Sequence, residues 1–117
     1  MSTPHIELWQ AEWCPSSRRV RQRLTELGLS FIAHQVPADR EQRLELQRIS
    51  TPARIPVIRV DGQTVAEADQ ILAFLDANFP EPAGAAAHRA KLNEKESEFC
   101  ASCAAAAAEP AGAAVGA

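Results

Sequence analysis

The order of strand-like and helix-like segments in residues 5–36 constrains the fold more than any other feature of the chain. Residues 5–9 alternate loosely between apolar and polar side chains, as a short strand does. Apolar residues at helical spacing follow between residues 15 and 27, and residues 31–36 return to a strand pattern. A strand, a helix and a strand in this order predict two parallel strands joined by a right-handed crossover.

Both ends of the predicted helix carry residues that suit helix termini. Pro15 fits the first helical position, where its missing N–H costs nothing, so Cys14 falls at the N-cap. Gly28 stands at the C′ position, where a left-handed backbone ends many helices. The sequence therefore predicts a thiol at the first junction between a strand and a helix.

A second helix is predicted from Asp39, which can serve as its N-cap, to about Ser50. Its expected apolar side consists of Leu44, Leu46 and Ile49. Residues 51–56 carry two prolines and read as a loop. The helix is thus expected to be followed by an irregular connection rather than by a strand.

A hairpin and a third helix complete the pattern up to residue 80. Asp61-Gly62 is a strong turn dipeptide between two short strand patterns, residues 57–60 and 63–65. Residues 67–78 have helical spacing, with Ile71, Leu72, Phe74 and Leu75 expected to face inward. The fold class is therefore α/β, in the order β-α-β-α-β-β-α, with a mixed four-stranded sheet.

The composition changes at Pro80-Glu81-Pro82. All nine basic residues before position 80 are arginine, whereas 15 of the 35 residues from Ala83 onward are alanine. We therefore expect residues 1–81 to form the α/β domain. Residues 82–117 are expected to form an alanine-rich tail that is helical in part or disordered, with one helix over 88–109.

Charge and cysteine content narrow the possible partners and compartment. Lys and Arg number 12 and Asp and Glu 15, a net charge of −3, which argues against nucleic acid or an anionic membrane as the main partner. The start of the chain lacks a signal-peptide pattern. Three cysteines without a disulfide framework suit a reducing compartment. We expect a cytoplasmic monomer or weak dimer.

Cys14 is the strongest candidate for a reactive residue in the sequence. A thiol at a helix N-terminus lies beside unpaired backbone N–H groups and the positive end of the helix dipole, and both favour the thiolate. Arg18 and Arg19 add positive charge near the first turn, whereas Arg21 and Arg23 are expected on a solvated face. The chain thus predicts a nucleophilic thiol. The alternative is a small buried apolar residue, the usual role of a single cysteine.

Three motifs in order resemble those of a known superfamily over about residues 5–80. Cys14-Pro15-Ser16-Ser17 resembles the Cys-Pro-X-Ser form of the glutaredoxin active site. Ile55-Pro56-Val57 resembles the loop with a cis proline before the third strand, and Glu67 to Ile71 resembles a Glu-Ser-X-X-Ile helix opening. Together they resemble glutaredoxins and the N-terminal domain of cytosolic glutathione S-transferases, which share the thioredoxin fold.

The resemblance implies a binding site for glutathione, which would serve as a co-substrate. Its implied contacts are Trp13, Pro15, Arg18, Arg54, Ile55, Pro56, Glu67, Ala68 and Asp69. The backbone of Ile55 would pair with the tripeptide, and the third helix would bind the γ-glutamyl end through its N-terminal amides and the carboxylate of Glu67 or Asp69. Arg18 or Arg54 would take the glycine carboxylate.

Some residues depart from the family pattern or keep two readings open. Ala68 stands where transferases usually have a serine that contacts the γ-glutamyl carboxylate. The chain has no tyrosine to activate glutathione as some transferases do. Trp13 would shield the thiol, form the pocket wall or pack beside the end of a strand. His34 is expected to be a strand residue without a functional role.

Ser17 determines which reaction the resemblance implies. It occupies the position of the second thiol in dithiol enzymes, so Cys14 has no disulfide partner within the motif. The expected function is that of a monothiol, glutathione-dependent oxidoreductase that removes glutathione from thiols through Cys14, with Ser17 beside it. The alternative is a non-catalytic module that binds glutathione or a partner. An iron–sulfur carrier is less expected, because such proteins usually have Cys-Gly-Phe-Ser where this chain has Cys-Pro-Ser-Ser. A transferase is also less expected, because the helical second domain of transferases is typically much longer than the 37 residues after Pro80.

The tail contains a second cysteine motif, Cys100-Ala101-Ser102-Cys103. A structural zinc site needs four ligands, and only His88 lies nearby as a third. A redox pair needs a junction between a strand and a helix, which an alanine-rich segment does not provide. Incidental tail cysteines are the favoured interpretation, with a resolving thiol for Cys14 or a metal site as alternatives, and we expect no metal.

Overall fold

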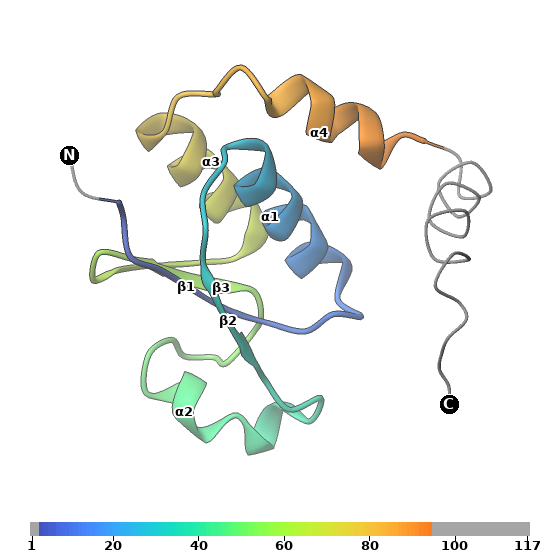
Figure 1. Ribbon diagram of the computed structural model, residues 1–117. Coiled ribbons are helices and arrows are strands. Elements are labelled where there is room, and N and C mark those ends of the chain that lie inside the picture. Colours follow the sequence, from blue (N-terminus) through green and yellow to red (C-terminus); the bar gives the residue numbers. More distant parts are fainter. Residues whose placement is uncertain (1–2, 95–117) are drawn as a thin grey trace, which may run out of the picture. The chain divides into compact units, whose positions relative to one another are not determined.

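The computed structural model describes residues 3–94. Backbone contacts divide the chain into one unit that ends at Ala86 and a second that begins at Ala87. The first unit contains, in order, β1 (Ile6–Gln10), α1 (Pro15–Glu26), β2 (Ile32–Gln35), η1 (Arg40–Gln42), α2 (Leu44–Gln47), β3 (Val57–Val60), β4 (Gln63–Ala66) and α3 (Ala68–Asn78) (Figure 1). The predicted α/β fold class is confirmed, and the expected boundary at residue 81 stays a prediction.

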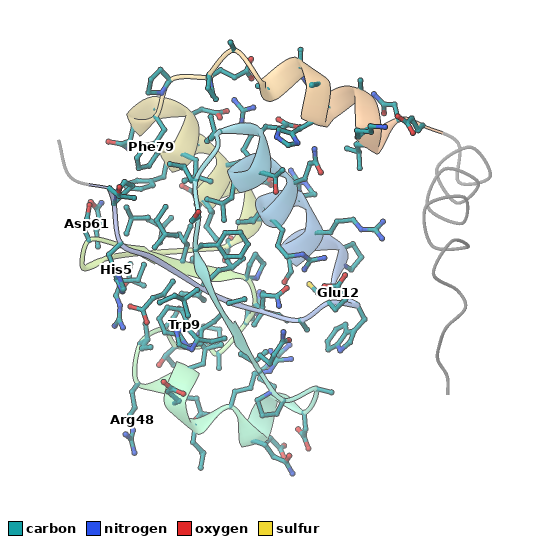
Figure 2. All side chains as sticks on the ribbon, viewed as in Figure 1. His5, Trp9, Glu12, Arg48, Asp61 and Phe79 are labelled. Atoms are coloured by element: carbon teal, nitrogen blue, oxygen red, sulfur yellow. The ribbon has the colours of Figure 1, made fainter. Side chains whose placement is uncertain are left out.

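The four strands form one mixed sheet in the order β2-β1-β3-β4. β1 pairs in parallel with β2, while β3 pairs antiparallel with both β1 and β4. Asp61 and Gly62 have φ values of 49° and 90°, the positive values of a type I′ turn that matches the twist of a hairpin. The backbone N–H of His5 donates to the Asp61 carboxylate at 2.9 Å, and Figure 2 shows both residues at this end of the sheet.

The two faces of the sheet pack against different helices. Ile6 and Leu8 point to the face that α1 and α3 cover, and they join the larger apolar core. Trp9 points to the opposite face, because side chains alternate along a strand, and it packs with Leu46 of α2 and with Val57. Figure 1 shows α1 and α3 together on one side of the strands and α2 on the other.

The second predicted helix is wrong in one respect, because it breaks in the middle. Asp39 caps η1 as expected, its carboxylate accepting from the N–H of Glu41 at 3.0 Å, but Arg43 has a ψ of 59° and leaves the helical region. The buried Arg43 guanidinium donates to the carbonyls of Pro37, Ala38 and Ala53. Leu44, expected on the apolar side, is therefore 65% exposed.

The helix predicted over residues 88–109 begins earlier than expected. α4 spans Ala85–Leu92, since the alanines directly after Gly84 are strong helix formers. The N–H groups of Asn93 and Glu94 donate three residues back, so the helix closes as a turn after Leu92. The rest of the predicted helix, with Cys100 and Cys103, lies outside the described residues.

Arg23 does not lie on a solvated face, contrary to the sequence expectation. Its guanidinium is 2.7 Å from Glu26, 2.8 Å from Asp76 of α3 and 2.8 Å from Glu81. The hydrogen bonds with Glu81 and Glu26 raise the pKa of Arg23 further above its ordinary value. Arg23 thus joins α1 to α3 and to the segment after α3, a role that the spacing of arginines could not reveal.

A polar cluster lies around Trp9, on the sheet face that packs against α2. Glu7 of β1 lies 2.9 Å from Nε2 of His34 and accepts a hydrogen bond from Arg59 at 3.2 Å. Trp9 lies between the same two residues: it stacks on His34 with ring centroids 4.7 Å apart, and the Arg59 guanidinium is 5.1 Å from the ring. Cross-strand pairs of this kind stabilise the sheet from β2 to β3.

The ionised Glu7 carboxylate stabilises the folded state, and this contribution to the free energy of unfolding decreases at acid pH. The hydrogen bond with His34 lowers the pKa of Glu7 most, Arg59 lowers it further, and burial acts in the opposite direction. Because the folded pKa lies below the unfolded value of about 4.3, the stabilisation is complete above that value and is lost as pH falls through the folded pKa.

We expect Glu7→Gln to lose less stability than the wild type between about pH 5 and pH 3, measured by urea denaturation. Glu41→Gln is the matched control, since Glu41 is an exposed carboxylate outside the ion pairs that Glu7 makes with His5, His34 and Arg59. Equal losses in all three proteins would show that Glu7 does not carry this dependence.

Candidate functional site

The register of the sheet brings three separate segments to one edge of the sheet, the edge at which β1 and β4 end and β3 begins. Trp9 at the end of β1 pairs with Val57 at the start of β3, and Val57 pairs with Ala66 at the end of β4. The loop to Cys14, the Ile55-Pro56 segment and the start of α3 therefore all leave the sheet at the same edge. The N–H of Glu67 donates to the carbonyl of Pro56 at 3.3 Å, which joins the second segment to the third.

Cys14 is the N-cap of α1, as predicted, with Pro15 at the first helical position. Its Sγ accepts from the N–H of Ser17 at 3.4 Å, and its own N–H donates to the carbonyl of Ala11 at 3.1 Å. The residue is 9% exposed and belongs to neither apolar core cluster. Cys14 therefore counts among the buried apolar residues, as the alternative from the sequence expected, but its sulfur also has a polar contact in the N–H of Ser17.

The surroundings of the thiol favour its ionised form. Burial alone would raise the pKa of Cys14, but the Ser17 side chain, the backbone N–H groups of Ser17 and Ser16 and the charge of Arg21 outweigh burial. The net effect is a pKa below the ordinary thiol value, which is what an N-cap thiolate requires for reactivity.

Ser17 lies in the interior, with no exposed surface. Its Oγ accepts from the backbone N–H of Ala11 at 3.4 Å, while its own N–H donates to the Cys14 sulfur. Ser17 therefore connects the end of β1 to the first turn of α1 directly behind the thiol. Sequence reasoning placed Ser17 next to Cys14 but could not predict the contact with Ala11.

The arginines of α1 divide differently from the sequence expectation. Arg19 forms an ion pair with Asp69 of α3 at 2.9 Å, and Arg18 is exposed. Arg21, expected on a solvated face, instead bonds the loop before Cys14, through Gln10 and the carbonyl of Ala11. Arg21 is thus the charge that sequence reasoning missed. Its position one helical turn after Ser17 was the available signal.

The Ile55-Pro56 peptide bond is cis, as the resemblance implied, and Thr51-Pro52 is a second cis bond that was not expected. Pro56 is buried, whereas Ile55 packs partly against the cluster around Trp9. Among residues 3–94, neither the N–H nor the carbonyl of Ile55 makes a backbone hydrogen bond. Both groups therefore remain available to an extended ligand.

The start of α3 presents amides without a side-chain cap. Glu67 is the N-cap residue, and its φ of 70° and ψ of 133° are unusual for a residue with a side chain. Ala68 is buried, and Asp69 is exposed apart from its ion pair with Arg19. The first-turn N–H groups are thus free to donate to an anion.

Trp13 and Arg54 lie at the surface. Trp13 is 64% exposed, so most of its side chain does not pack against the end of a strand. Arg54 is exposed, with its backbone N–H donating to Pro52 at 2.8 Å. The sequence-predicted site residues therefore lie on the three segments that leave this edge of the sheet, but no contact between Arg54 and Cys14 is found within residues 3–94.

Two cavities border the α2 region, and neither is lined by Cys14. One of about 220 Å³ is lined by Trp9, Gln35, Val36, Pro37, Gln42, Arg43, Leu44, Glu45 and Leu46. Another of about 370 Å³ is lined by Arg40, Glu41, Gln47, Thr51, Pro52 and Ala53.

In the described part of the chain no three His, Cys, Asp or Glu side chains form a group that could hold a metal ion. No helix there is long and apolar enough to span a membrane.

A four-stranded mixed sheet, a cysteine at the N-cap of the first helix and a cis proline before β3 define a thioredoxin-like domain. Residues 13–78 match the family model of the glutathione S-transferase N-terminal domain. The match covers more than half of the chain, which therefore belongs to this family.

Two curated relatives represent the two branches of the resemblance. Glutathione S-transferase DHAR2 of Arabidopsis thaliana is 35% identical over 69 residues, which cover 59% of this chain and 32% of the plant protein. An uncharacterized glutaredoxin-like 8.6 kDa protein of Clostridium pasteurianum is 25% identical over 72 residues, 57% of this chain and 96% of that protein. The chain thus spans about a third of the plant relative and nearly all of the clostridial one.

Solved structures share the fold at lower sequence identity. The trimeric glutathione transferase TDR1 of Leishmania has a TM-score of 0.59 and 23% identity, over 67% of this chain and 18% of that one. FzlA from C. crescentus has a TM-score of 0.59 and 26% identity, over 67% of this chain and 36% of FzlA. Rice GST1, solved with glutathione, has a TM-score of 0.57 and 20% identity, over 90% and 45%.

Proposed function

We propose that this domain is a monothiol, glutathione-dependent thiol–disulfide oxidoreductase that acts through Cys14. One observation carries the proposal: the Cys14 sulfur caps α1 and accepts a hydrogen bond from the N–H of Ser17, where a dithiol enzyme has its second thiol. A thiolate held in this way is a nucleophile without a disulfide partner in its own motif. Glutathionylated thiols in the cytoplasm are the proposed substrates.

The proposed reaction has two exchanges. The Cys14 thiolate attacks the glutathione sulfur of a mixed disulfide, an S–S bond forms between Cys14 and glutathione, and the substrate leaves as a thiolate that takes up a proton. The thiolate of a second glutathione then attacks the glutathione sulfur of the adduct and restores the Cys14 thiolate. One mixed disulfide and one reduced glutathione thus become one free thiol and one glutathione disulfide.

We expect glutathione to bind across the sheet edge that the three segments share. The free N–H and carbonyl of Ile55 suit the backbone of the tripeptide, as in the addition of a short strand. The uncapped amides at the start of α3 suit the γ-glutamyl carboxylate, and the exposed Asp69 suits its ammonium group. Arg18 and Arg54, both exposed, are the proposed partners of the glycine carboxylate, and the exposed Trp13 is the proposed wall of the pocket.

Treatment of the full chain with oxidised glutathione tests the proposal. We expect one glutathione adduct by intact mass, and digestion should assign it to Cys14, because the lowered pKa of this thiol favours exchange near neutral pH. Reduced glutathione should then remove it. An adduct confined to Cys100 or Cys103, with Cys14 unmodified, would contradict the proposal.

A non-catalytic glutathione-binding module is the second candidate. It is favoured by the 9% exposure of Cys14, which restricts the approach of a bulky disulfide. Ala68 also lacks the hydroxyl that transferases usually offer to the γ-glutamyl group, which weakens binding in either case. Glutathione binding by calorimetry, together with no adduct on Cys14 and no turnover, would support the module over the enzyme.

A further inference from the structure

Arg21 connects the second turn of α1 to the loop that leads to Cys14. Its Nη1 donates to the side-chain oxygen of Gln10 and, at 3.3 Å, to the carbonyl of Ala11. Its Nη2 lies 3.4 Å from the carboxylate of Glu12. The Arg21 side chain is only 19% exposed, so its guanidinium contacts the last residue of β1 and the two residues after it in a partly desolvated position.

The backbone of Ala11 links this guanidinium to the thiol. The Ala11 carbonyl accepts from Arg21 and also from the N–H of Cys14 at 3.1 Å. The Ala11 N–H donates to Oγ of Ser17, and the Ser17 N–H donates to the Cys14 sulfur. Movement of Ala11 would therefore alter two of the contacts that hold the thiol at the helix N-terminus.

Arg21 is also a cation close enough to act on Cys14 through charge. Glu12 is the acidic group that the described structure places against the guanidinium, and it is largely exposed, so it offsets this charge only in part. Figure 2 shows Glu12 in the loop between β1 and α1. The same side chain thus supplies both the position of the loop and part of the positive potential.

We propose that Arg21 is a positioning residue that tunes the reactivity of Cys14, by fixing the end of β1 at Gln10 and the Ala11–Glu12 segment after it, and by holding a positive charge near the thiol. This inference rests on the proposed function for its purpose, since a thiolate needs such support only if it reacts. Its mechanism concerns Cys14 alone and does not require glutathione to be bound.

The rate of Cys14 alkylation by iodoacetamide as a function of pH tests the proposal on the full chain. Mass spectrometry of digested protein separates Cys14 from Cys100 and Cys103. We expect Arg21→Met to react about three- to tenfold more slowly at neutral pH, with the midpoint of the profile at a higher pH, because a change of one pKa unit changes the thiolate fraction tenfold. At high pH its rate should equal or exceed the wild-type rate, since a more basic thiolate is the better nucleophile.

Three further variants separate charge from position. Arg21→Lys keeps the charge but not the planar donor set, so it should recover only part of the rate. Glu12→Gln keeps both Arg21 contacts to Gln10 and Ala11 and removes the opposing charge, so it should react faster than the wild type near neutral pH. Arg48→Met removes an exposed arginine far along the chain and should leave the profile unchanged.

An unchanged midpoint in Arg21→Met, or a slower reaction in Glu12→Gln, would overturn the proposal. Circular dichroism shows whether each variant is folded. If Arg21→Met does not fold, the alkylation rate of Glu12→Gln tests the proposal in its place. Because iodoacetamide needs no glutathione site, this result is independent of turnover. A normal alkylation profile with no glutathione exchange would count against the proposed function and not against the role of Arg21.

Discussion

Replacement of Cys14 by serine is expected to reduce turnover of a glutathione mixed disulfide to the uncatalysed rate. In the assay, the protein is incubated with a small glutathionylated thiol, reduced glutathione and a recycling reductase. A serine hydroxyl is not ionised near neutral pH and forms no disulfide, so both exchanges lose their nucleophile. We expect the loss to be roughly two orders of magnitude or more.

The paired substitution Cys100→Ser and Cys103→Ser is the matched control for this experiment. If the tail cysteines are incidental, the double variant keeps wild-type turnover, and only the substitution at the helix N-terminus removes it. Turnover that survives Cys14→Ser would exclude Cys14 from the mechanism. Loss of turnover in the double variant would instead show that a tail thiol takes part, as the resolving-thiol alternative requires.

Replacement of Arg23 by methionine is expected to lower the free energy of unfolding by about 2–3 kcal/mol, below the range for fully buried pairs because the guanidinium is partly exposed. Methionine keeps much of the apolar stem, so the change isolates the charge. Glu26, 8% exposed, loses its guanidinium partner, and so do Asp76 and Glu81. Urea denaturation followed by circular dichroism measures the difference.

Arg18→Met on the same helix is the control for Arg23. Arg18 is exposed, so its replacement should change the unfolding free energy by no more than about 0.5 kcal/mol. A double variant, Arg23→Met with Glu26→Gln, should recover part of the loss, because the carboxylate is then no longer charged in a buried position. Equal stability of Arg23→Met and Arg18→Met would contradict the structural role of Arg23.

Several features of the fold could be predicted because neighbours within a few residues determine them. Cys14, Pro15 and Gly28 mark the ends of α1 through backbone preferences that act locally. The Asp61-Gly62 turn likewise depends on positive φ values that these two residues tolerate. The element order and the position of the thiol therefore followed from the chain alone.

The second helix shows where local reasoning stops. The spacing of Leu44 and Leu46 with Ile49 is compatible with a continuous helix, but Arg43 leaves the helical region between η1 and α2. Its guanidinium bonds to carbonyls on both sides of the segment, at Pro37 and at Ala53. Helical propensity could not indicate this break, because the acceptors become neighbours only after the chain has folded.

By itself the sequence determined the order of strands and helices, the N-cap thiol and the absence of a second thiol at Ser17, since these depend on residue type and spacing. The tertiary structure alone decided that Ile55 and the start of α3 leave the same sheet edge as Cys14, through the register at Val57. It also decided which arginine bonds the segment before the thiol and acts on the thiol through its charge. A side chain as long as that of Arg21 reaches whichever partner the packing places near it, and spacing along a helix does not specify that partner.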